Sequence, residues 1–432
     1  MKYIARTILP DLQKWIDRRE IYAIKGPRQS GKTTILKILQ DWLITEKGVN
    51  PENIVFFTLE DRELLEKFSV SPKDLIKSYL SREKERYYFL IDEFQYLPDG
   101  GRTLKLLYDL FENVKFIITG SSSLELAAHT GKFLVGRVFN FYLWQLSFQE
   151  FLTVKFPQLS NVYQEKNLLV RRFISDGKDF IVSDDIFGKD FQRVFEDYVL
   201  WGGYPEVVKT DDNETRSIIL KNILETYLTR DIVELLKITD LSQYRKLMVL
   251  LSSRTGNLIS YQDLTLTVQS YFQEIKKYLS ILEETFVINL LKPYFSSKGA
   301  EIKKNPKLYF QDTGLRNYLI QNFIGLSLRP DKGALVENVV FNQLKIKWGE
   351  KYQLKYWRTL AKAEIDFVLE SPDELLPAEV KYSEFKQPQV SRSFRNFVEQ
   401  YKPKRALVLT NNFWSGFTIN STNIKFLPVW YL

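Results

Sequence analysis

The sequence predicts an α/β protein with a parallel sheet in its N-terminal region. Short apolar runs of the kind that forms buried parallel strands recur along this region, and helical patterns separate them. The runs lie at residues 21–24, 54–59, 87–91 and 114–118. Polar or glycine-rich segments follow directly after these runs, at the edge where an α/β sheet presents its ligands. At 432 residues the chain is too long for one ordinary core, so we expect two or three domains.

Composition narrows the possible functions. The chain has no cysteine, which excludes disulfides and thiolate metal sites, and one histidine, His129, which removes most histidine-based catalysis. Lys and Arg exceed Asp and Glu by 61 to 53, and this charge of +8 permits nucleic-acid binding without showing it. No apolar run is long enough for a transmembrane helix. The start MKYIARTILPDLQKW lacks a signal-peptide core, so we expect a cytoplasmic protein with no membrane partner.

The first run leads into the strongest motif, GPRQSGKTT at residues 26–34. The order is strand, glycine-rich loop and helix, which is the arrangement of a phosphate loop. Glycines let backbone N–H groups crowd around a phosphate, and the helix N-terminus adds to anion binding. We expect Lys32 to reach the β- and γ-phosphates and the Thr33 hydroxyl to bind Mg²⁺. The candidate nucleotide-binding residues are Gly26, Pro27, Arg28, Gln29, Ser30, Gly31, Lys32, Thr33 and Thr34, and the predicted cofactors are ATP and Mg²⁺.

Two further runs end in polar residues that suit the same site. The strand at 87–91 runs into Asp92 and Glu93, so we expect Asp92 to hold the Mg²⁺ shell and Glu93 to polarise the attacking water as a general base. The strand at 114–118 ends near Thr119 and Ser121. These positions resemble the sensor 1 residue of the AAA+ ATPases, which implies a contact with the γ-phosphate or the lytic water. The sequence does not choose between the two hydroxyls.

The segment after this core carries a more specific resemblance. Gly136-Arg137 followed by Leu-Ser-Phe-Gln-Glu-Phe at 146–151 is similar to a run in archaeal and bacterial AAA+ proteins with a C-terminal DUF4143 domain. The resemblance implies that Arg137 senses the γ-phosphate; a surface salt bridge is the alternative. From this resemblance we expect an AAA+ core at residues 1–150 and a helical lid at 151–239. Within the lid we expect a charged, turn-rich insertion at 155–195.

Two motifs fall within the predicted lid. Gly203 and Pro205 resemble a Gly-x-Pro signature of the related STAND ATPases, which packs near the adenine; a plain turn between helices is the alternative. The resemblance continues with TYLTRDIVELLKI, where Arg230 and Asp231 sit on an expected helix. We assign these two charged residues no role from the sequence.

Residues 240–312 are similar to a winged helix. Two helical patterns precede a β segment, and Gln273, Lys276 and Lys277 lie on the second, the candidate DNA-recognition helix. The lysine-rich loop at 292–307 suits a wing that touches phosphates. A purely structural or protein-contact module with a solvated charged face is the alternative.

The C-terminal region, 313–432, holds a second constellation. Glu337 lies on an expected helix, Arg358 follows a strand pattern as a candidate DNA contact, and Asp366 lies on an alternating strand opposite Ile365, Phe367 and Leu369. Glu379 and Lys381 share one face of the next strand. Carboxylates suit Mg²⁺ or Mn²⁺, and a lysine beside them can orient the metal-bound water. This looks like the PD-(D/E)xK nuclease core to which DUF4143 is related, with Glu337, Asp366 and Glu379 as metal ligands and Lys381 as catalytic. A non-cleaving DNA-binding or interaction platform is the alternative.

Together these patterns predict an α/β chain with a P-loop AAA+ core, a helical lid, a winged-helix-like segment and a C-terminal restriction-endonuclease-like domain. We expect a Mg²⁺-dependent ATPase that couples ATP hydrolysis to work on, or regulation at, DNA, with metal-dependent cleavage left open. The alternative is a STAND-like switch whose output is a protein contact and whose nuclease-like domain is inactive. The sequence leaves oligomerisation and ring size open.

Overall fold

The computed structural model describes residues 3–81, 85–121, 134–181, 185–236, 238, 240–294 and 305–432. The chain divides into two compact units that interleave along the sequence. The first unit consists of Met1–Leu146, Thr226–Leu236 and Ser280–Phe286, and the second of Ser147–Glu225, Lys237–Leu279 and Val287–Leu432. The single histidine, His129, lies outside the described residues. So do residues 295–304, which are most of the predicted wing loop at 292–307.

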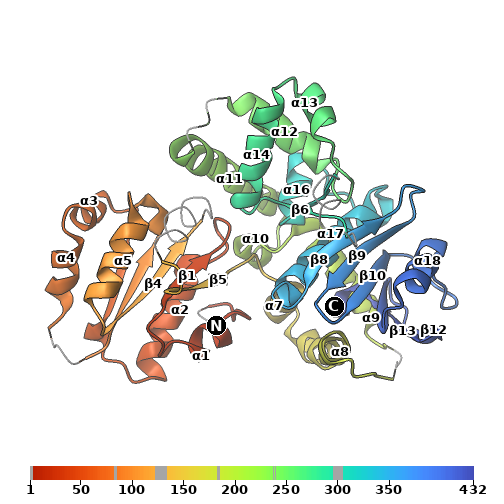
Figure 1. The fold of residues 1–432 in the computed structure, drawn as a ribbon, viewed down its shortest axis with the longest axis horizontal. Helices are drawn as coiled ribbons and strands as arrows, with labels where there is room; N and C mark the ends of the chain where they lie inside the picture. The colour runs from red at the N-terminus through yellow and green to blue at the C-terminus, as the bar shows by residue number, and fades with distance from the viewer. Residues whose placement is uncertain are drawn as a thin grey trace. The chain divides into compact units, whose positions relative to one another are not determined.

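The first unit contains a five-stranded parallel sheet (Figure 1). Its strand order is β2-β3-β4-β1-β5, so the two strands that carry the predicted phosphate loop and acidic pair are separated only by β4. The strands are β1 (Ile21–Lys25), β2 (Ile54–Thr58), β3 (Tyr87–Asp92), β4 (Val114–Gly120) and β5 (Val138–Tyr142). The first four match the predicted apolar runs; the fifth was not predicted as a strand.

Helices cover both faces of this sheet. On one face Leu12, Ile16 and Leu36 belong to a core formed with α1 and α2, and on the other Phe68, Ile76 and Leu104 belong to a core formed with α3, α4 and α5. The helices are α1 (Leu9–Lys14), α2 (Lys32–Thr45), α3 (Arg62–Val70), α4 (Pro72–Tyr79) and α5 (Gly100–Leu110), with short 3-10 turns η1 (Pro51–Asn53) and η2 (Phe94–Tyr96). A π-helix, η3 (Tyr227–Leu235), also belongs to this unit.

The second unit begins with a run of helices that covers most of the predicted lid; residues 226–236 of the predicted lid belong to the first unit. The motif Leu-Ser-Phe-Gln-Glu-Phe has a local cause here, because Ser147 and Glu150 form a capping box at the start of α7. Much of the predicted insertion forms α8, a 20-residue helix whose Tyr163 hydroxyl donates to the Leu432 carbonyl at 3.1 Å. The helices are α7 (Phe148–Lys155), α8 (Pro157–Asp176), α9 (Gly188–Trp201), α10 (Pro205–Lys209) and α11 (Asn213–Thr226).

Three helices and a two-stranded antiparallel sheet follow, in the order predicted for the winged-helix-like segment. They are α12 (Leu241–Ser252), α13 (Tyr261–Val268), α14 (Phe272–Glu284), β6 (Ile288–Leu291) and β7 (Lys307–Phe310). A short helix, α16 (Thr313–Leu319), and the turn η4 (Leu326–Leu328) lead to the C-terminal domain.

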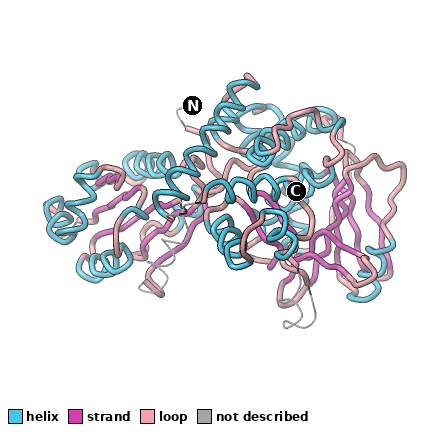
Figure 2. Tube along the Cα trace, turned by 90° about the horizontal axis from the view of Figure 1, so that it is seen from above, coloured by secondary structure: helices cyan, strands magenta, loops and turns pink. Residues whose placement is uncertain are grey.

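The C-terminal domain contains a six-stranded mixed sheet of order β12-β13-β11-β10-β9-β8, drawn in blue in Figure 1. Its strands gather as one magenta group in Figure 2. Phe394 and Phe397 of α18 pack on one core of the sheet, and Phe341 of α17 contacts Phe367 of β9. The elements are α17 (Lys332–Trp348), β8 (Gln353–Arg358), β9 (Glu364–Glu370), β10 (Leu375–Lys381), α18 (Arg392–Tyr401), β11 (Arg405–Thr410), β12 (Ser415–Ile419), β13 (Thr422–Pro428) and η5 (Val429–Tyr431).

Strict alternation along β9 is a prediction that the structure corrects. Lys355 pairs with Val368 while Trp357 pairs with Ile365, so two residues of β9, Asp366 and Phe367, lie opposite the single residue between them on β8. This is a β-bulge, which re-aims the side chains on either side of it. Ile365 consequently shares a core with Val368 rather than with Phe367.

Within the part of the chain that the structure describes, no helix combines the length and the apolar character needed to cross a bilayer.

Candidate functional site

The loop between β1 and α2 has the backbone of a phosphate loop. A Cβ at Gly26 would lie 2.1 Å from the Leu143 carbonyl oxygen, so only glycine fits there. Gly31 has φ +97° and Gln29 has φ +57°, the left-handed conformations that turn the chain back before α2 begins. Arg6 holds the loop from outside, donating to the Ser30 carbonyl at 2.8 Å. The loop is therefore shaped before any ligand arrives.

Lys32 is buried, and its ammonium group is held only loosely. Its Nζ donates to the carbonyl oxygens of Gly26 at 3.1 Å and Pro27 at 2.8 Å. Burial lowers the pKa of Lys32, an effect that the nearby carboxylates of Glu93 and Asp92 oppose. The buried Ser30 hydroxyl has no hydrogen-bond partner among the described residues. An unsatisfied hydroxyl in the same loop as a buried ammonium group is a good fit to phosphate oxygens.

A chain of hydroxyls connects this loop to the predicted acidic pair. Thr33 Oγ1 donates to one carboxylate oxygen of Asp92 at 2.5 Å, and Thr119 Oγ1 donates to the other. The Glu93 backbone N–H donates to the same Thr119 hydroxyl at 3.1 Å. The hydroxyl and the carboxylate are the hard oxygen donors that Mg²⁺ prefers, and a nucleotide-bound Mg²⁺ needs only one or two protein ligands besides phosphate and water. Thr33 and Asp92 therefore fit a Mg²⁺ ion held together with a nucleotide.

Glu93 is held in an uncommon conformation. Its φ of +55° lies in the left-handed region, which is rare for residues other than glycine and concentrates at functional sites. Gln95 donates to the Glu93 carboxylate and also to the Ser121 hydroxyl, the latter at 3.2 Å. The two hydroxyls that the sequence left open thus have different neighbours, since Thr119 contacts Asp92 whereas Ser121 contacts Gln95.

Asp231 is a site residue that sequence reasoning missed. It lies on the π-helix η3, and its carboxylate pairs with Arg28 of the phosphate loop at 2.7 Å, with both side chains at most 10% exposed. Ser121 Oγ donates to its other oxygen at 3.4 Å, and Arg28 also donates to the Tyr96 hydroxyl at 3.2 Å. Burial raises the pKa of Asp231, an effect that Arg28 opposes. π-helices are frequent at functional sites, but neither this helix type nor the burial of Asp231 shows in the sequence.

Arg137 does not lie at the phosphate loop of its own chain. It directly precedes β5, and its carbonyl accepts from Ile21 N at 2.8 Å, where β1 begins. The phosphate loop follows the other end of β1, at Lys25. The Arg137 guanidinium pairs with Asp109 at 3.3 Å, which is the surface salt bridge that the sequence left as the alternative.

Gly203 and Pro205 belong to the second unit and have structural contacts there. The Gly203 N–H donates to the buried Asp312 carboxylate at 2.8 Å, and Pro205 begins α10. Asp312 also accepts from Leu315 N at 2.8 Å, capping α16. Burial raises the pKa of Asp312 to about 6, although the backbone N–H donors act to lower it. The turn at Gly203 is therefore hydrogen-bonded, through the Asp312 carboxylate, to the start of α16.

The predicted DNA-contacting residues of α14 are exposed. Gln273, Lys276 and Lys277 all lie on the surface of the helix, at the spacing that places side chains on one face. They contrast with Ile275 and Tyr278 of the same helix, which are buried.

The second constellation gathers around an additional lysine, Lys307 of β7. Its Nζ lies 3.1 Å from Glu337 Oε1, 2.5 Å from Glu364 Oε1 and 3.7 Å from Asp366 Oδ1. Burial acts to lower the pKa of Lys307, but the carboxylates outweigh it and the pKa lies above the ordinary value. Arg358, the predicted DNA contact, is engaged here as well, at 2.7 Å from Glu364. We refer to Glu337, Glu364 and Asp366 as the carboxylate cluster.

The predicted catalytic lysine lies beside this cluster on β10. Lys381 Nζ is 3.0 Å from Glu379 Oε1, and Ser391 Oγ donates to the other Glu379 oxygen at 3.2 Å. Asp366 Oδ2 accepts from Val380 N at 2.8 Å. The structure therefore brings the predicted nuclease residues into one neighbourhood, but each carboxylate already has a partner.

A divalent metal does not fit this arrangement. Among the described residues, no three His, Asp or Glu side chains are grouped so that they hold a metal ion. Glu337 and Asp366 face the Lys307 ammonium, and Glu379 faces Lys381. Sequence reasoning missed Lys307 because it ends a lysine-rich segment that we assigned to a solvent-facing wing.

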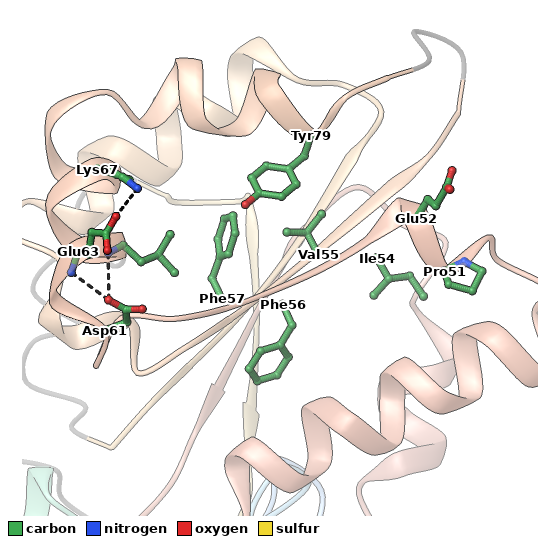
Figure 3. Close-up of a pocket in the computed structure, with 11 residues that line it drawn as sticks. Pro51, Glu52, Ile54, Val55, Phe56, Phe57, Asp61, Glu63, Lys67 and Tyr79 are labelled. Carbon is green, nitrogen blue, oxygen red and sulfur yellow. Dashed lines mark hydrogen bonds and ion pairs between the residues drawn. The ribbon is translucent and has the colours of Figure 1, made fainter.

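A pocket at the edge strand β2 has no evident chemistry (Figure 3). Two of its acidic residues already have local partners, since Asp61 caps α3 by accepting from Glu63 N at 2.9 Å and Glu63 pairs with Lys67 at 2.6 Å. Its lining, which includes Phe57 and Tyr79, contains none of the predicted site residues.

The parallel sheet, the phosphate loop and the acidic strand end form a P-loop ATPase-like core. Comparison with family models agrees, since residues 18–152 match an AAA domain. Residues 332–432 match the domain of unknown function DUF4143, and residues 192–327 match a second domain of unknown function, DUF8612. The chain therefore combines an AAA domain with a C-terminal DUF4143 domain, as the sequence motifs predicted.

Relatives that match most of this chain occur in other organisms. An uncharacterised protein of Haemophilus influenzae is 26% identical over 434 residues, covering 98% of this chain and 97% of its own. One of Mycobacterium tuberculosis is 26% identical over 388 residues, covering 89% of this chain and 75% of its own. Among solved structures, the Walker-type ATPase PABY2304 of Pyrococcus abyssi is 15% identical with a TM-score of 0.43, covering 74% of this chain and 96% of its own.

Proposed function

We propose that the chain is a Mg²⁺-dependent ATPase that couples ATP binding and hydrolysis to work on, or regulation at, DNA. The observation that carries the ATPase part is the continuous contact from Thr33 through Asp92 to Thr119. It joins the phosphate loop to the ends of β3 and β4, beside the buried Lys32. This is the set of groups that ATP hydrolysis by P-loop enzymes requires.

Each residue has a distinct role in this proposal. Lys32 exchanges its carbonyl partners for phosphate oxygens, and the backbone N–H groups of 26–31 surround the β-phosphate. Thr33 and Asp92 hold Mg²⁺, which when bound neutralises charge on the phosphates. Glu93, held by Gln95, orients the attacking water and accepts its proton. Thr119 fixes both the Asp92 carboxylate and the Glu93 backbone.

Arg28 and Asp231 are a positioning pair in the same proposal. Asp231 holds the Arg28 guanidinium against η3 when no phosphate is present, and a γ-phosphate competes for the same guanidinium. Arg230 pairs with Glu60 at 2.5 Å, so η3 contacts this unit at two adjacent residues. The segment that contains η3 is flanked in sequence by parts of the second unit on both sides. A nucleotide-dependent movement of Asp231 would therefore be transmitted along the backbone to the segments of the second unit that precede and follow η3.

The DNA part of the proposal rests on charge. The chain carries a formal charge of +8, and α14 presents Gln273, Lys276 and Lys277 on an exposed helical face. Metal-dependent cleavage is not part of the proposal, because no metal-holding group of carboxylates occurs among the described residues.

The test measures ATP hydrolysis by the full chain with single-stranded, duplex and branched DNA, in Mg²⁺ and in Mn²⁺. We expect hydrolysis that Asp92→Asn removes and that one DNA structure stimulates. The double charge reversal Lys276→Glu and Lys277→Glu should abolish the stimulation without lowering the DNA-free rate. Lys73→Glu with Lys77→Glu, on the exposed face of α4, is the matched control and should leave stimulation intact. Hydrolysis in the Asp92→Asn variant would contradict the site assignment.

A second candidate is a nucleotide-dependent switch of the STAND kind whose output is a protein contact. The observation that favours it is the engagement of Glu337, Asp366 and Glu379 by lysines, as expected of a nuclease-like domain that does not cleave. The same assay separates the two. Slow hydrolysis that no DNA stimulates supports the switch and contradicts the coupling to DNA.

A further inference from the structure

We infer that the Lys307 ammonium is the resident cation of the carboxylate cluster and stands where a divalent metal would otherwise bind. The C-terminal domain then binds no metal ion at this position. The inference concerns a different site from the ATPase proposal and does not rest on it.

The geometry around Lys307 is that of a cation with its ligands. Its Nζ contacts carboxylate oxygens of Glu337, Glu364 and Asp366, and the side chain is 3% exposed. Lysine is rarely buried to this extent unless paired. The three acids come from the helix α17 and the strand β9, so the ammonium joins two elements of the domain in the way a structural metal would.

The strand that carries Lys307 is firmly attached to the domain. The Phe310 backbone N–H donates to Asn338 Oδ1 at 2.7 Å, and Asn338 Nδ2 donates back to the Phe310 carbonyl at 2.6 Å. The Tyr309 hydroxyl donates to Glu337 at 2.6 Å, and its ring stacks on Phe341 with centroids 4.5 Å apart. Withdrawing Lys307 would break these contacts with α17, so the ammonium is part of the folded domain.

Two further acceptors beside the cluster, Asp366 Oδ2 and the Glu379 carboxylate, are already engaged. Asp366 Oδ2 accepts from Val380 N at 2.8 Å, and Glu379 is shared between Lys381 and Ser391. Mg²⁺ requires near-octahedral oxygens at about 2.0–2.1 Å. An ion placed among these carboxylates would also lie beside the Lys307 ammonium and be repelled by it.

The test counts Mn²⁺ ions bound to the nucleotide-free full chain by electron paramagnetic resonance, together with Tm. The key variant is Lys307→Met, which keeps the length of the side chain and removes its charge. We expect the wild type to bind no Mn²⁺ that depends on Asp366. Lys307→Met should gain one Mn²⁺ site that the wild type lacks and should regain Tm when Mn²⁺ is added, because the metal replaces the lost charge.

The matched control is Lys425→Met, on β13 of the six-stranded sheet that also contains β9. Lys425 is also buried. Its Nζ lies 2.7 Å from Asp179 Oδ1, and neither residue belongs to the carboxylate cluster. This variant should lose stability without gaining Mn²⁺ binding. Adding Asp366→Asn to Lys307→Met should remove the new Mn²⁺ site.

Two results would overturn the inference. One is Mn²⁺ bound by the wild type and lost on Asp366→Asn, which would show that Lys307 does not exclude the metal; this comparison stands even if Lys307→Met fails to fold. The other is a folded Lys307→Met that binds no Mn²⁺, which would show that the carboxylates are not a metal set at all.

Discussion

Two buried lysines, one in each unit, are held by opposite kinds of partner. Lys32 donates to two backbone carbonyls of its own loop, whereas Lys307 lies among three carboxylates. Burial lowers the pKa of Lys32, while the pKa of Lys307 is raised because its acidic neighbours outweigh burial. Burial thus outweighs the neighbouring carboxylates at Lys32, whereas the neighbouring carboxylates outweigh burial at Lys307.

The difference explains what each region is suited to bind. Lys32 can exchange its two carbonyl partners for phosphate oxygens, so its loop suits an anion such as a phosphate. The Lys307 ammonium and the surrounding carboxylates neutralise one another. That region therefore suits neither an anion nor a metal ion. A motif of acids and lysines therefore does not by itself define a catalytic site.

The largest expected effect is that of Lys32→Ala on ATP hydrolysis. Loss of the ammonium removes the main cationic contact to the phosphates, and we expect kcat/KM to fall by about a hundredfold to a thousandfold. The matched control is Lys37→Ala, an exposed lysine on the same helix, which should leave the rate unchanged. Steady-state hydrolysis measures both, and a normal rate in Lys32→Ala would refute the phosphate loop.

Next in size is the stability change caused by Lys307→Met without metal. Removing one partner of a buried ion cluster leaves uncompensated carboxylates, and we expect a loss of about 3–5 kcal/mol in the free energy of unfolding. Denaturant unfolding followed by tryptophan fluorescence measures it. In the double variant Lys307→Met with Glu337→Gln the losses should not add, because both residues belong to one cluster. Full additivity would mean that the two groups do not interact.

A third lysine allows a test by pH. Lys115 donates to the Arg18 carbonyl at 3.0 Å and to that of Glu20, and burial lowers its pKa from 10.5 to about 7, to which Arg86 contributes. Between these values the unfolded chain binds more protons than the folded one, so stability rises with pH across that window. From pH 7 to 9 the rise should be roughly 2 kcal/mol in the wild type and absent in Lys115→Met. Equal pH dependence in the two proteins would contradict the assignment of Lys115 as a buried lysine with a lowered pKa.

The smallest expected effect is that of Asp231→Asn on nucleotide affinity. The amide no longer holds Arg28 by charge, so the guanidinium is free to move to a γ-phosphate. We expect ATP to bind up to about tenfold more tightly relative to ADP, a shift of about 1.4 kcal/mol. Calorimetric titration with both nucleotides measures it. An equal change for ATP and ADP would mean that Asp231 does not respond to the γ-phosphate.

The parallel sheet was predictable because its central strands are continuous apolar runs. β3 is buried along its whole length and ends in Asp92, so the strand and the acidic pair at its end could be predicted from the sequence together. β5 escaped prediction because this edge strand is half exposed and Asn140 interrupts its apolar residues. The AAA and DUF4143 domains were predicted from motifs that have local structural causes, such as the capping box of Ser147 and Glu150.

The partners of charged residues were not predictable. Asp231 and Lys307 are polar residues in segments that look solvent-exposed, and only the tertiary fold buries them against Arg28 and against the acids of α17 and β9. The β-bulge at Asp366 likewise depends on pairing with β8, which no periodicity along β9 reveals. Local patterns thus predict elements and candidate residues, whereas the charge balance of a buried site depends on distant segments.

One measurement tests the contrast between the two regions most directly, namely the number of Mn²⁺ ions bound by the wild-type chain before and after addition of ATP. We predict no tightly bound ion in the nucleotide-free chain and one ion per chain with ATP, which Lys32→Ala abolishes. One ion bound without nucleotide and lost on Asp366→Asn would contradict the assignment of Lys307, and no ion bound with ATP would contradict the assignment of the phosphate loop.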